Sequence, residues 1–198
     1  MTEIAALILA AGLSKRMGQP KMFLPWGNVT VLEKSIETFT KSGIQQIIVV
    51  TGENTAAVQE LLHRTTSAGN CEILYNPNYG DGEMVNSIKV GLTAVNSMAD
   101  ATFIALGDHP QLDPIIPARM LEAYEKKSSD LIIPSFQNRR GHPWLVGRPL
   151  FGAILGLGQN ETMRTFIQNY QDSIHYIEGN ESILKDLDTP EDYRRDKP

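Results

Sequence analysis

The sequence predicts a three-layer α/β/α fold with a mostly parallel β-sheet, and two observations support this fold class. Short apolar runs recur along the first two thirds of the chain, separated by segments with helical periodicity. The runs are continuously apolar rather than alternating, which is typical of strands covered on both faces in a parallel sheet. Strands that alternate with helices of this length form βαβ units, in which helices cover the sheet.

Six segments have the composition of strands. They are short runs of continuously apolar residues, as buried strands of a parallel sheet are. The strands are predicted at residues 4–9, 46–51, 72–75, 101–106, 130–134 and 144–146. The last of them follows a segment, residues 138–143, that we expect to be an exposed loop.

Amphipathic segments between the strands predict the helices. In residues 31–41, Leu32, Ile36 and Phe39 fall on one face, and Gly43 follows as a C-cap. Apolar residues mark four more helices: Val58, Leu61 and Leu62; Ile88, Leu92 and Val95; Met120, Leu121 and Tyr124; and the segment 162–170. Thr189 and Pro190 begin a last helix. Because no linker, repeat or low-complexity segment interrupts the chain, we expect one domain over residues 1–198.

Composition limits the classes of function. The chain has 198 residues and a formal net charge of −5, which disfavours a broad surface for nucleic acid, because such surfaces need clustered Lys and Arg. Cys71 is the only cysteine, so no intrachain disulfide can form and a reducing compartment is the simpler interpretation. The apolar run at residues 4–11 is too short to span a bilayer, and the start of the chain lacks the positive charge of a secretory signal. We therefore expect a cytoplasmic protein.

A loop with small and basic residues directly follows the first predicted strand. It begins with two alanines and Gly12, which let backbone N–H groups approach a phosphate, and it carries Lys15, Arg16 and Lys21. The carboxyl end of such a strand is where ligands bind in α/β sheets. The loop matches neither G-x-G-x-x-G nor G-x-x-x-x-G-K-[ST], which argues against a nicotinamide dehydrogenase. From these local features, a solvated basic connection is the alternative to a phosphate-binding loop.

Two acidic segments are candidates for metal ligation. Asp108 follows the run 101–106 and is expected at the same edge of the sheet as the basic loop. Mg²⁺ prefers oxygen ligands, so an aspartate beside a triphosphate is a natural ligand, although capping of the turn before Pro110 is the alternative role. Asp186 and Asp188 are alternate residues of one segment and would point the same way if it is extended, so either can complete the site.

These motifs together resemble the signature of the nucleotidyltransferases related to molybdenum cofactor biosynthesis. The resemblance extends over residues 4–193, and Ala11 makes it closest to the cytidylyltransferase branch, since the guanylyltransferase branch usually has a glycine there. Its motifs are Leu9-Ala10-Ala11-Gly12-x-Ser14-x-Arg16-Met17-Gly18-x-x-Lys21, Leu106-Gly107-Asp108-His109-Pro110, Arg140-Gly141-His142-Pro143 and Asp186-Leu187-Asp188-Thr189-Pro190-Glu191-Asp192. It implies the Rossmann-like fold of nucleotide-diphospho-sugar transferases.

The resemblance also implies roles for individual residues. Arg16, Lys21 and Asp108 are the expected catalytic residues: Arg16 holds the pyrophosphate, Lys21 stabilises the α-phosphoryl oxygens and Asp108 holds the metal. Asp108 with Asp186 and Asp188 would bind Mg²⁺, with Mn²⁺ as an alternative. Arg140 and His142 would bind the acceptor. The expected nucleotide-binding residues are Leu9, Ala10, Ala11, Gly12, Ser14, Arg16, Lys21, Asn76, Gly82 and Ser87.

The implied reaction is transfer of CMP from CTP to molybdopterin with release of pyrophosphate, and the implied client is a molybdenum hydroxylase. Two departures from the family pattern leave base and acceptor open: Glu83 stands between Gly82 and Met84, and residues 111–113 read Gln-Leu-Asp where Pro-Leu-Thr is frequent. A guanylyltransferase or a sugar-phosphate nucleotidyltransferase is therefore an alternative. A nucleotide- or cofactor-binding carrier without catalysis is the alternative from outside the enzymes.

Overall fold

A mixed, mostly parallel β-sheet forms the centre of the protein. The computed structural model describes residues 2–64, 71–81, 84–126 and 128–198. Within them, an eight-stranded sheet has the order β10-β7-β9-β6-β1-β4-β5, with β8 paired to β7. The strands are β1 (Ile4–Ala10), β4 (Gln46–Thr51), β5 (Cys71–Tyr75), β6 (Ala101–Leu106), β7 (Leu131–Phe136), β8 (Arg139–Arg140), β9 (Trp144–Gly147) and β10 (Ile174–Glu178).

The central strand β1 has a parallel neighbour on each side. Leu7 pairs with Ile48 of β4 and with Ile104 of β6. On the far side of β6, strand β9 is antiparallel to both β6 and β7, while β10 is parallel to β7. Strand β9 therefore runs opposite to both of its neighbours and separates two parallel groups of strands.

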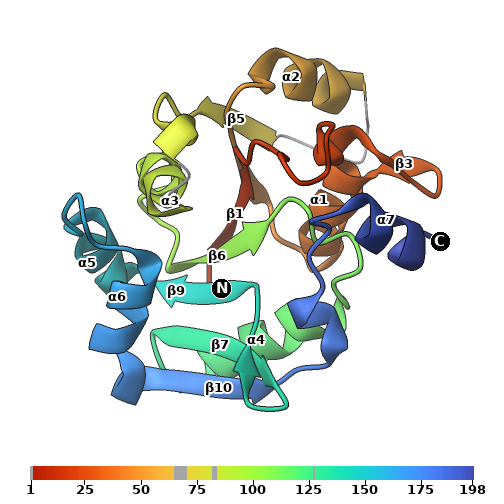
Figure 1. Ribbon diagram of the computed structural model, residues 1–198. Coiled ribbons are helices and arrows are strands. Elements are labelled where there is room, and N and C mark those ends of the chain that lie inside the picture. Colours follow the sequence, from red (N-terminus) through yellow and green to blue (C-terminus); the bar gives the residue numbers. More distant parts are fainter. Residues whose placement is uncertain (1, 65–70, 82–83, 127) are drawn as a thin grey trace.

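Helices cover both faces of this sheet (Figure 1). One face packs against α1 (Val31–Lys41), α2 (Thr55–Arg64) and α4 (Ile115–Glu125). The other packs against α3 (Met84–Leu92), α5 (Phe151–Leu155) and α6 (Met163–Asn169). Alternate residues of β1 serve the two faces, because Ala6 and Ile8 belong to the first core and Leu7 and Leu9 to the second. The prediction of a three-layer α/β/α fold is confirmed.

Local sequence explains where these helices begin and how closely they pack. A capping box starts α1, since the Thr30 side chain accepts from the N–H of Glu33 while Glu33 accepts from the N–H of Thr30. In α3, Gly91 lies directly against Leu7 of β1, and a Cβ atom there would overlap the leucine side chain. This close approach packs the last turn of α3 against the middle of β1.

The C-terminal segment crosses back to the loop that follows β1. A small hairpin of β2 (Pro25–Trp26) and β3 (Val29–Thr30) follows that loop, and α7 (Pro190–Asp196) lies beside it (Figure 1). Leu187 is fully buried in a cluster with Met17, Trp26 and Val31. These apolar contacts hold the acidic residues on either side of Leu187 next to the basic loop.

The six predicted strands are present, with ends shifted by up to two residues. Strand β10, helix α5 and the β2–β3 hairpin were not predicted. Two details differ from expectation: Val95 lies beyond the end of α3, and Arg139–Arg140 pairs with β7 as a short strand within the expected loop. Across the described ranges, no helix combines the length and the apolar character needed to cross a membrane.

Candidate active site

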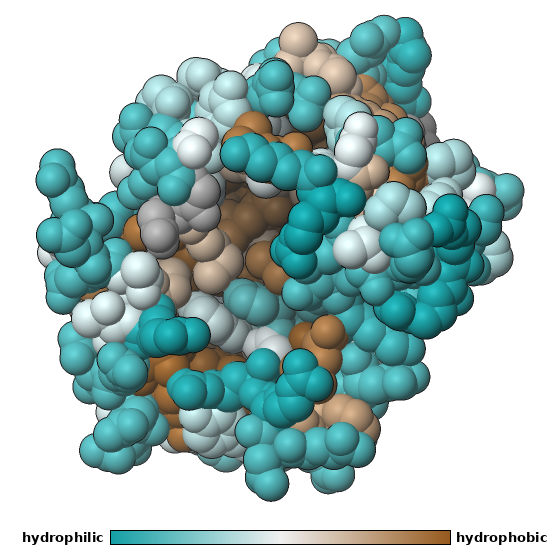
Figure 2. Space-filling view, viewed as in Figure 1, coloured by the Kyte–Doolittle hydropathy of each residue, from teal (hydrophilic) through white to brown (hydrophobic). Residues whose placement is uncertain are grey.

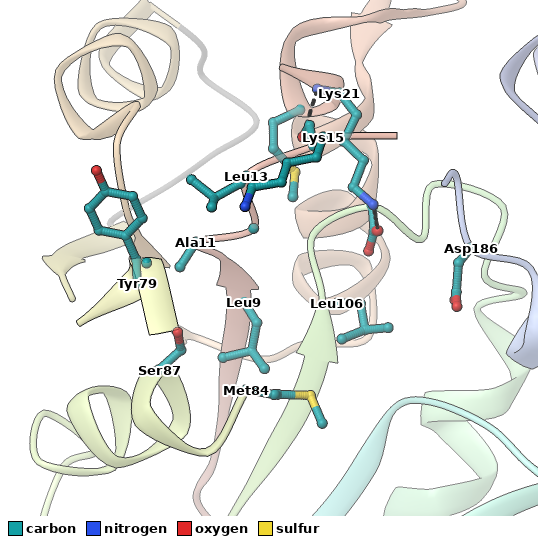
Figure 3. A pocket seen from close by; sticks show the side chains of 15 residues that line it. Leu9, Ala11, Leu13, Lys15, Lys21, Tyr79, Met84, Ser87, Leu106 and Asp186 are labelled. Atoms are coloured by element: carbon teal, nitrogen blue, oxygen red, sulfur yellow. Dashed lines mark hydrogen bonds and ion pairs between the residues drawn. The ribbon is translucent and has the colours of Figure 1, made fainter. Parts of the chain in front are cut away.

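A cavity of about 420 Å³ lies at the carboxyl ends of β1 and β6. The space-filling view shows a hollow with an apolar floor and a largely polar rim (Figure 2). In close-up, Tyr79 and Ser87 lie on one side of the cavity and Lys21 and Asp186 on the other (Figure 3). The cavity is lined by Leu9, Ala11, Gly12, Leu13, Ser14, Lys15, Lys21, Met22, Tyr79, Gly80, Met84, Ser87, Leu106, Asp108 and Asp186.

The loop between β1 and Lys21 turns around Ser14. Ser14 has a positive φ of 50°, and its carbonyl accepts from the N–H groups of Met17 (3.0 Å) and Gly18 (3.1 Å). Its hydroxyl accepts from the N–H of Lys21 at 3.3 Å. With the Met17 side chain buried, the loop is anchored on one side and open to the cavity on the other. Such a loop can present backbone N–H groups to an anion.

Lys21 lies between two carboxylates at the end of this loop. Its ammonium contacts Asp108 Oδ2 and lies 3.3 Å from Asp188 Oδ1, and only 11% of its side chain is exposed. Burial by itself would lower the pKa of Lys21, but the charge and hydrogen bonding of Asp108, and then of Asp188, outweigh it and raise the pKa above its usual value. Lys21 is therefore a fixed, permanently charged group beside the cavity.

The two other cations of the loop take different positions. Arg16 is ion-paired to Asp188 at 2.8 Å, with 72% of its side chain exposed, and it is not among the residues that line the cavity. Lys15 does line the cavity (Figure 3). To hold the pyrophosphate, as predicted, Arg16 would have to leave Asp188 and reach the nucleotide. The role predicted for Lys21 requires no such change, because Lys21 already lines the cavity.

The segment after β5 supplies the opposite wall. Asn76 is 1% exposed; its amide donates to Ser87 Oγ at 3.0 Å and accepts from the N–H of Asn78 at 2.9 Å. Asn76 thus supports the wall from behind, whereas Ser87 reaches the cavity itself. Tyr79 packs against Gly52, where a Cβ atom would come within 2.7 Å of the ring. Gly82, also predicted to bind nucleotide, lies outside the described residues.

Asp186 reaches the cavity from the C-terminal segment, where its side chain is 47% exposed. Its Oδ1 lies 2.6 Å from Nε2 of His109, a residue only 2% exposed. Burial, the largest single influence, would raise the pKa of Asp186, but the hydrogen bond and charge of His109, together with the charges of His142 and Lys21, outweigh it and lower the pKa below its usual value. Asp186 is therefore an anion at neutral pH.

The two cavity carboxylates, Asp108 and Asp186, suit a hard divalent cation. Among the residues that the structure describes, no group of three or more His, Cys, Asp and Glu side chains forms a complete metal site. Mg²⁺ is usually held by one or two carboxylates together with substrate phosphates and water, so two oxygen-bearing side chains are sufficient. Asp188 does not line the cavity and is paired with both Arg16 and Lys21, whereas Asp108 lines it and is paired with Lys21 alone.

His142 and Arg140, the residues predicted to bind the acceptor, lie outside the lining of this cavity. The His142 ring stacks on Trp144, with centroids 4.6 Å apart, and its Nδ1 lies 3.5 Å from the carbonyl of Ile104. Burial, followed by the nearby His109, lowers the pKa of His142 from 6.5 to about 4. The imidazole is neutral at pH 7, which suits hydrogen bonding. Arg140 is exposed.

The low pKa of His142 predicts a loss of stability in mild acid. Below pH 6.5 the unfolded chain binds a proton at this histidine, whereas the folded protein, with His109 and Asp186 facing the ring, does so only near pH 4. The free energy of unfolding should therefore fall between pH 7 and pH 4, by at most about 3 kcal/mol from this group. Urea unfolding of the wild type and His142→Asn across this range, without metal, measures it. Parallel pH profiles would contradict the assignment.

Several cavity residues were not among the predicted site residues: Leu13, Lys15, Met22, Tyr79, Gly80, Met84 and Leu106. Most of them are neighbours of predicted residues in the same loops, so their position in the chain was the available signal. The position of His109 next to Asp108 could have indicated a place near the site. Its contact with Asp186, 77 residues further along the chain, is a property of the tertiary structure.

Known proteins match this chain over almost its whole length. The family model of the MobA-like NTP transferase domain matches residues 6–174. The chain is 35% identical to the molybdenum cofactor cytidylyltransferase of Escherichia coli K12, over 98% of this chain and 95% of that protein. The crystal structure of Rv0371c from Mycobacterium tuberculosis superimposes with a TM-score of 0.81 and 26% identity, covering 98% of this chain and 97% of the other.

A further structure, of Rv0371c in complex with manganese, superimposes with a TM-score of 0.76 at 24% identity, covering 98% of this chain and 97% of that one. The fold and the matched family model agree with the basic loop and the carboxylates gathered at the carboxyl end of β1. The chain belongs to the family of MobA-like nucleotidyltransferases.

Proposed function

We propose that this protein is a Mg²⁺-dependent cytidylyltransferase that transfers CMP from CTP to the phosphate of molybdopterin and releases pyrophosphate. The observation that carries the proposal is the position of Lys21, held by Asp108 and Asp188 at the end of the phosphate loop and beside the cavity. A fixed cation next to carboxylates supplies what a triphosphate and its divalent cation require in one place.

Both reactants are anions, so repulsion and the charge that builds up on the α-phosphoryl group are the main obstacles. An oxygen of the acceptor phosphate attacks the α-phosphorus, and the bond to the pyrophosphate breaks. No nucleophilic side chain is needed, and positioning with electrostatic stabilisation supplies the acceleration. Lys21 stabilises the α-phosphoryl oxygens, and Arg16, released from Asp188, holds the leaving pyrophosphate. A divalent cation held by Asp108 and Asp186 would neutralise phosphate charge.

The wall opposite Lys21 is suited to the nucleotide. Ser87 Oγ accepts from Asn76 and has no acceptor for its own hydrogen among the described residues, so that hydrogen can be donated to an acceptor atom of the base or ribose. His142 and Arg140 are assigned to the acceptor by resemblance. The sequence identity to a molybdenum cofactor cytidylyltransferase supports CTP and molybdopterin as substrates. A molybdenum hydroxylase as client and a cytoplasmic location belong to the same proposal.

The test is pyrophosphate release from CTP, GTP, ATP and UTP, with Mg²⁺ and molybdopterin, and with Mn²⁺ replacing Mg²⁺ in a parallel series. We expect release to be fastest with CTP and to require both molybdopterin and the divalent cation. A preference for GTP would keep the reaction and change the donor. Activity with sugar 1-phosphates instead of molybdopterin would replace the acceptor, and nucleotide binding without any release would identify a carrier.

A further inference from the structure

His109 is a buried histidine that the proposed chemistry does not use. It stands between Asp108 and Pro110 in the turn after β6 and is 2% exposed. Its Nε2 lies 2.6 Å from Oδ1 of Asp186, which belongs to a segment 77 residues further along the chain. The hydrogen bond therefore joins the loop of one cavity carboxylate, Asp108, to the side chain of the other.

The surroundings of the imidazole decide which nitrogen carries the proton. Nδ1 of His109 is buried and has no hydrogen-bond partner within the described part of the chain. A buried N–H without an acceptor is costly, so a hydrogen on Nε2 is favoured over a hydrogen on Nδ1. In this form His109 donates to Asp186, and Asp186 keeps its second oxygen for other partners.

The backbone next to Asp186 is held by the same loop. The amide of Gln111 donates to the carbonyl of Lys185, while Leu187 is fully buried on the other side of Asp186. The main chain is thus fixed at both neighbours, whereas the Asp186 side chain is half exposed. Of the described residues, His109 alone forms a hydrogen bond with this carboxylate. Without that bond, the side chain would be free to rotate towards solvent.

We propose that His109 is a positioning residue that holds the Asp186 carboxylate towards the nucleotide cavity, ready for a divalent cation. This inference rests on the proposed function of the same site. Carboxylates that bind metals are generally oriented by hydrogen bonds from neighbouring groups, and loss of such a partner typically weakens metal binding about 10- to 100-fold. His109 acts through Asp186 and need not touch the substrates.

The experiment measures Mn²⁺ binding by electron paramagnetic resonance, with the non-hydrolysable donor α,β-methylene CTP present. His109→Leu removes the donor, whereas His109→Gln keeps an N–H near the position of Nε2. His175→Leu, in β10, is the matched control for loss of a histidine. We expect His109→Leu to weaken Mn²⁺ binding about 10- to 100-fold, with His109→Gln and the control close to wild type.

A second measurement separates positioning from damage to the fold. Binding of the same CTP analogue in EDTA should be equal in wild type and His109→Leu, because the phosphate loop and Ser87 do not depend on this hydrogen bond. If His109→Leu does not fold, His109→Asn replaces it, since the shorter amide does not reach Asp186. The proposal would be overturned if Mn²⁺ affinity were unchanged in His109→Leu, or in His109→Asn where it replaces the leucine variant. It would also be overturned if His109→Gln lost as much Mn²⁺ affinity as the variant without the donor.

The outcome does not depend on turnover. If no triphosphate releases pyrophosphate but Mn²⁺ binding still depends on a hydrogen-bond donor at residue 109, the proposed reaction fails and the positioning role stands. If the wild type binds no Mn²⁺ with the nucleotide analogue, the positioning role is refuted whatever the reaction.

Discussion

Asp108→Asn is expected to lower kcat for pyrophosphate release by roughly 10³-fold, the upper end of what a single electrostatic group contributes in enzymes. The amide has the shape of the carboxylate but not its charge, so the change removes the proposed cation ligand and the nearest partner of Lys21. The measurement is steady-state pyrophosphate release over a range of Mg²⁺ concentrations, with the exposed Asp172→Asn as control.

Nucleotide binding gives the sharper part of this prediction. With Asp108 neutral, Lys21 keeps only Asp188 as a partner, so binding of CTP in EDTA should be as tight as in wild type or tighter. A weaker CTP complex in EDTA would mean that Asp108 shapes the cavity instead of serving the cation. Full activity in Asp108→Asn would refute its catalytic role.

Lys21→Met is expected to affect both catalysis and stability. Removing the ammonium leaves Asp108 and Asp188 beside each other without the cation between them, in a place where the lysine was only 8% exposed. We expect the free energy of unfolding to fall by about 3 kcal/mol, the range found when one partner of a buried ion pair is removed. We also expect pyrophosphate release to fall by about 10³-fold, since Lys21 faces the proposed α-phosphoryl site.

Urea unfolding with and without Mg²⁺ measures the stability, and Mg²⁺ should restore part of the loss because it can neutralise the exposed carboxylates. Lys34→Met is the matched control: Lys34 pairs with Glu37 on the surface of α1, where ion pairs contribute little. The double variant Asp108→Asn/Lys21→Met should be more stable than Lys21→Met and no more active, since it removes the repulsion but not the defect in catalysis. A Lys21→Met protein as stable and active as wild type would contradict both roles.

The elements that sequence analysis identified are those whose burial leaves a local pattern. The apolar runs of β1, β4 and β6 are covered on both faces, so composition alone marks them. Strand β10 has a mixture of polar and apolar residues at the edge of the sheet, and the β2–β3 hairpin has two residues in each strand. Neither offers a periodic signal, and both depend on partners far away in the chain.

The same division applies to the candidate site. Its location at the carboxyl end of β1 follows from the order of strand, basic loop and helix, and Asp108 follows from its place after an apolar run. The different positions of the three loop cations do not follow from the sequence. Lys21 and Lys15 line the cavity, while Arg16 is paired with Asp188. Likewise, the alternate spacing of Asp186 and Asp188 placed both near the site without distinguishing their partners.

The sequence by itself determined the fold class, the position of the basic loop after β1 and the edge of the sheet where the acidic residues gather, because hydrophobic periodicity and turn chemistry act within a few residues. Only the tertiary structure decided which carboxylate meets which cation and that His109 holds Asp186. Those contacts join residues 77 to 172 positions apart, and the ones made by Asp186 and Asp188 depend on the burial of Leu187, which brings the C-terminal segment back to the loop after β1. Long-range pairing of this kind is set by packing of the whole chain, which no local pattern encodes.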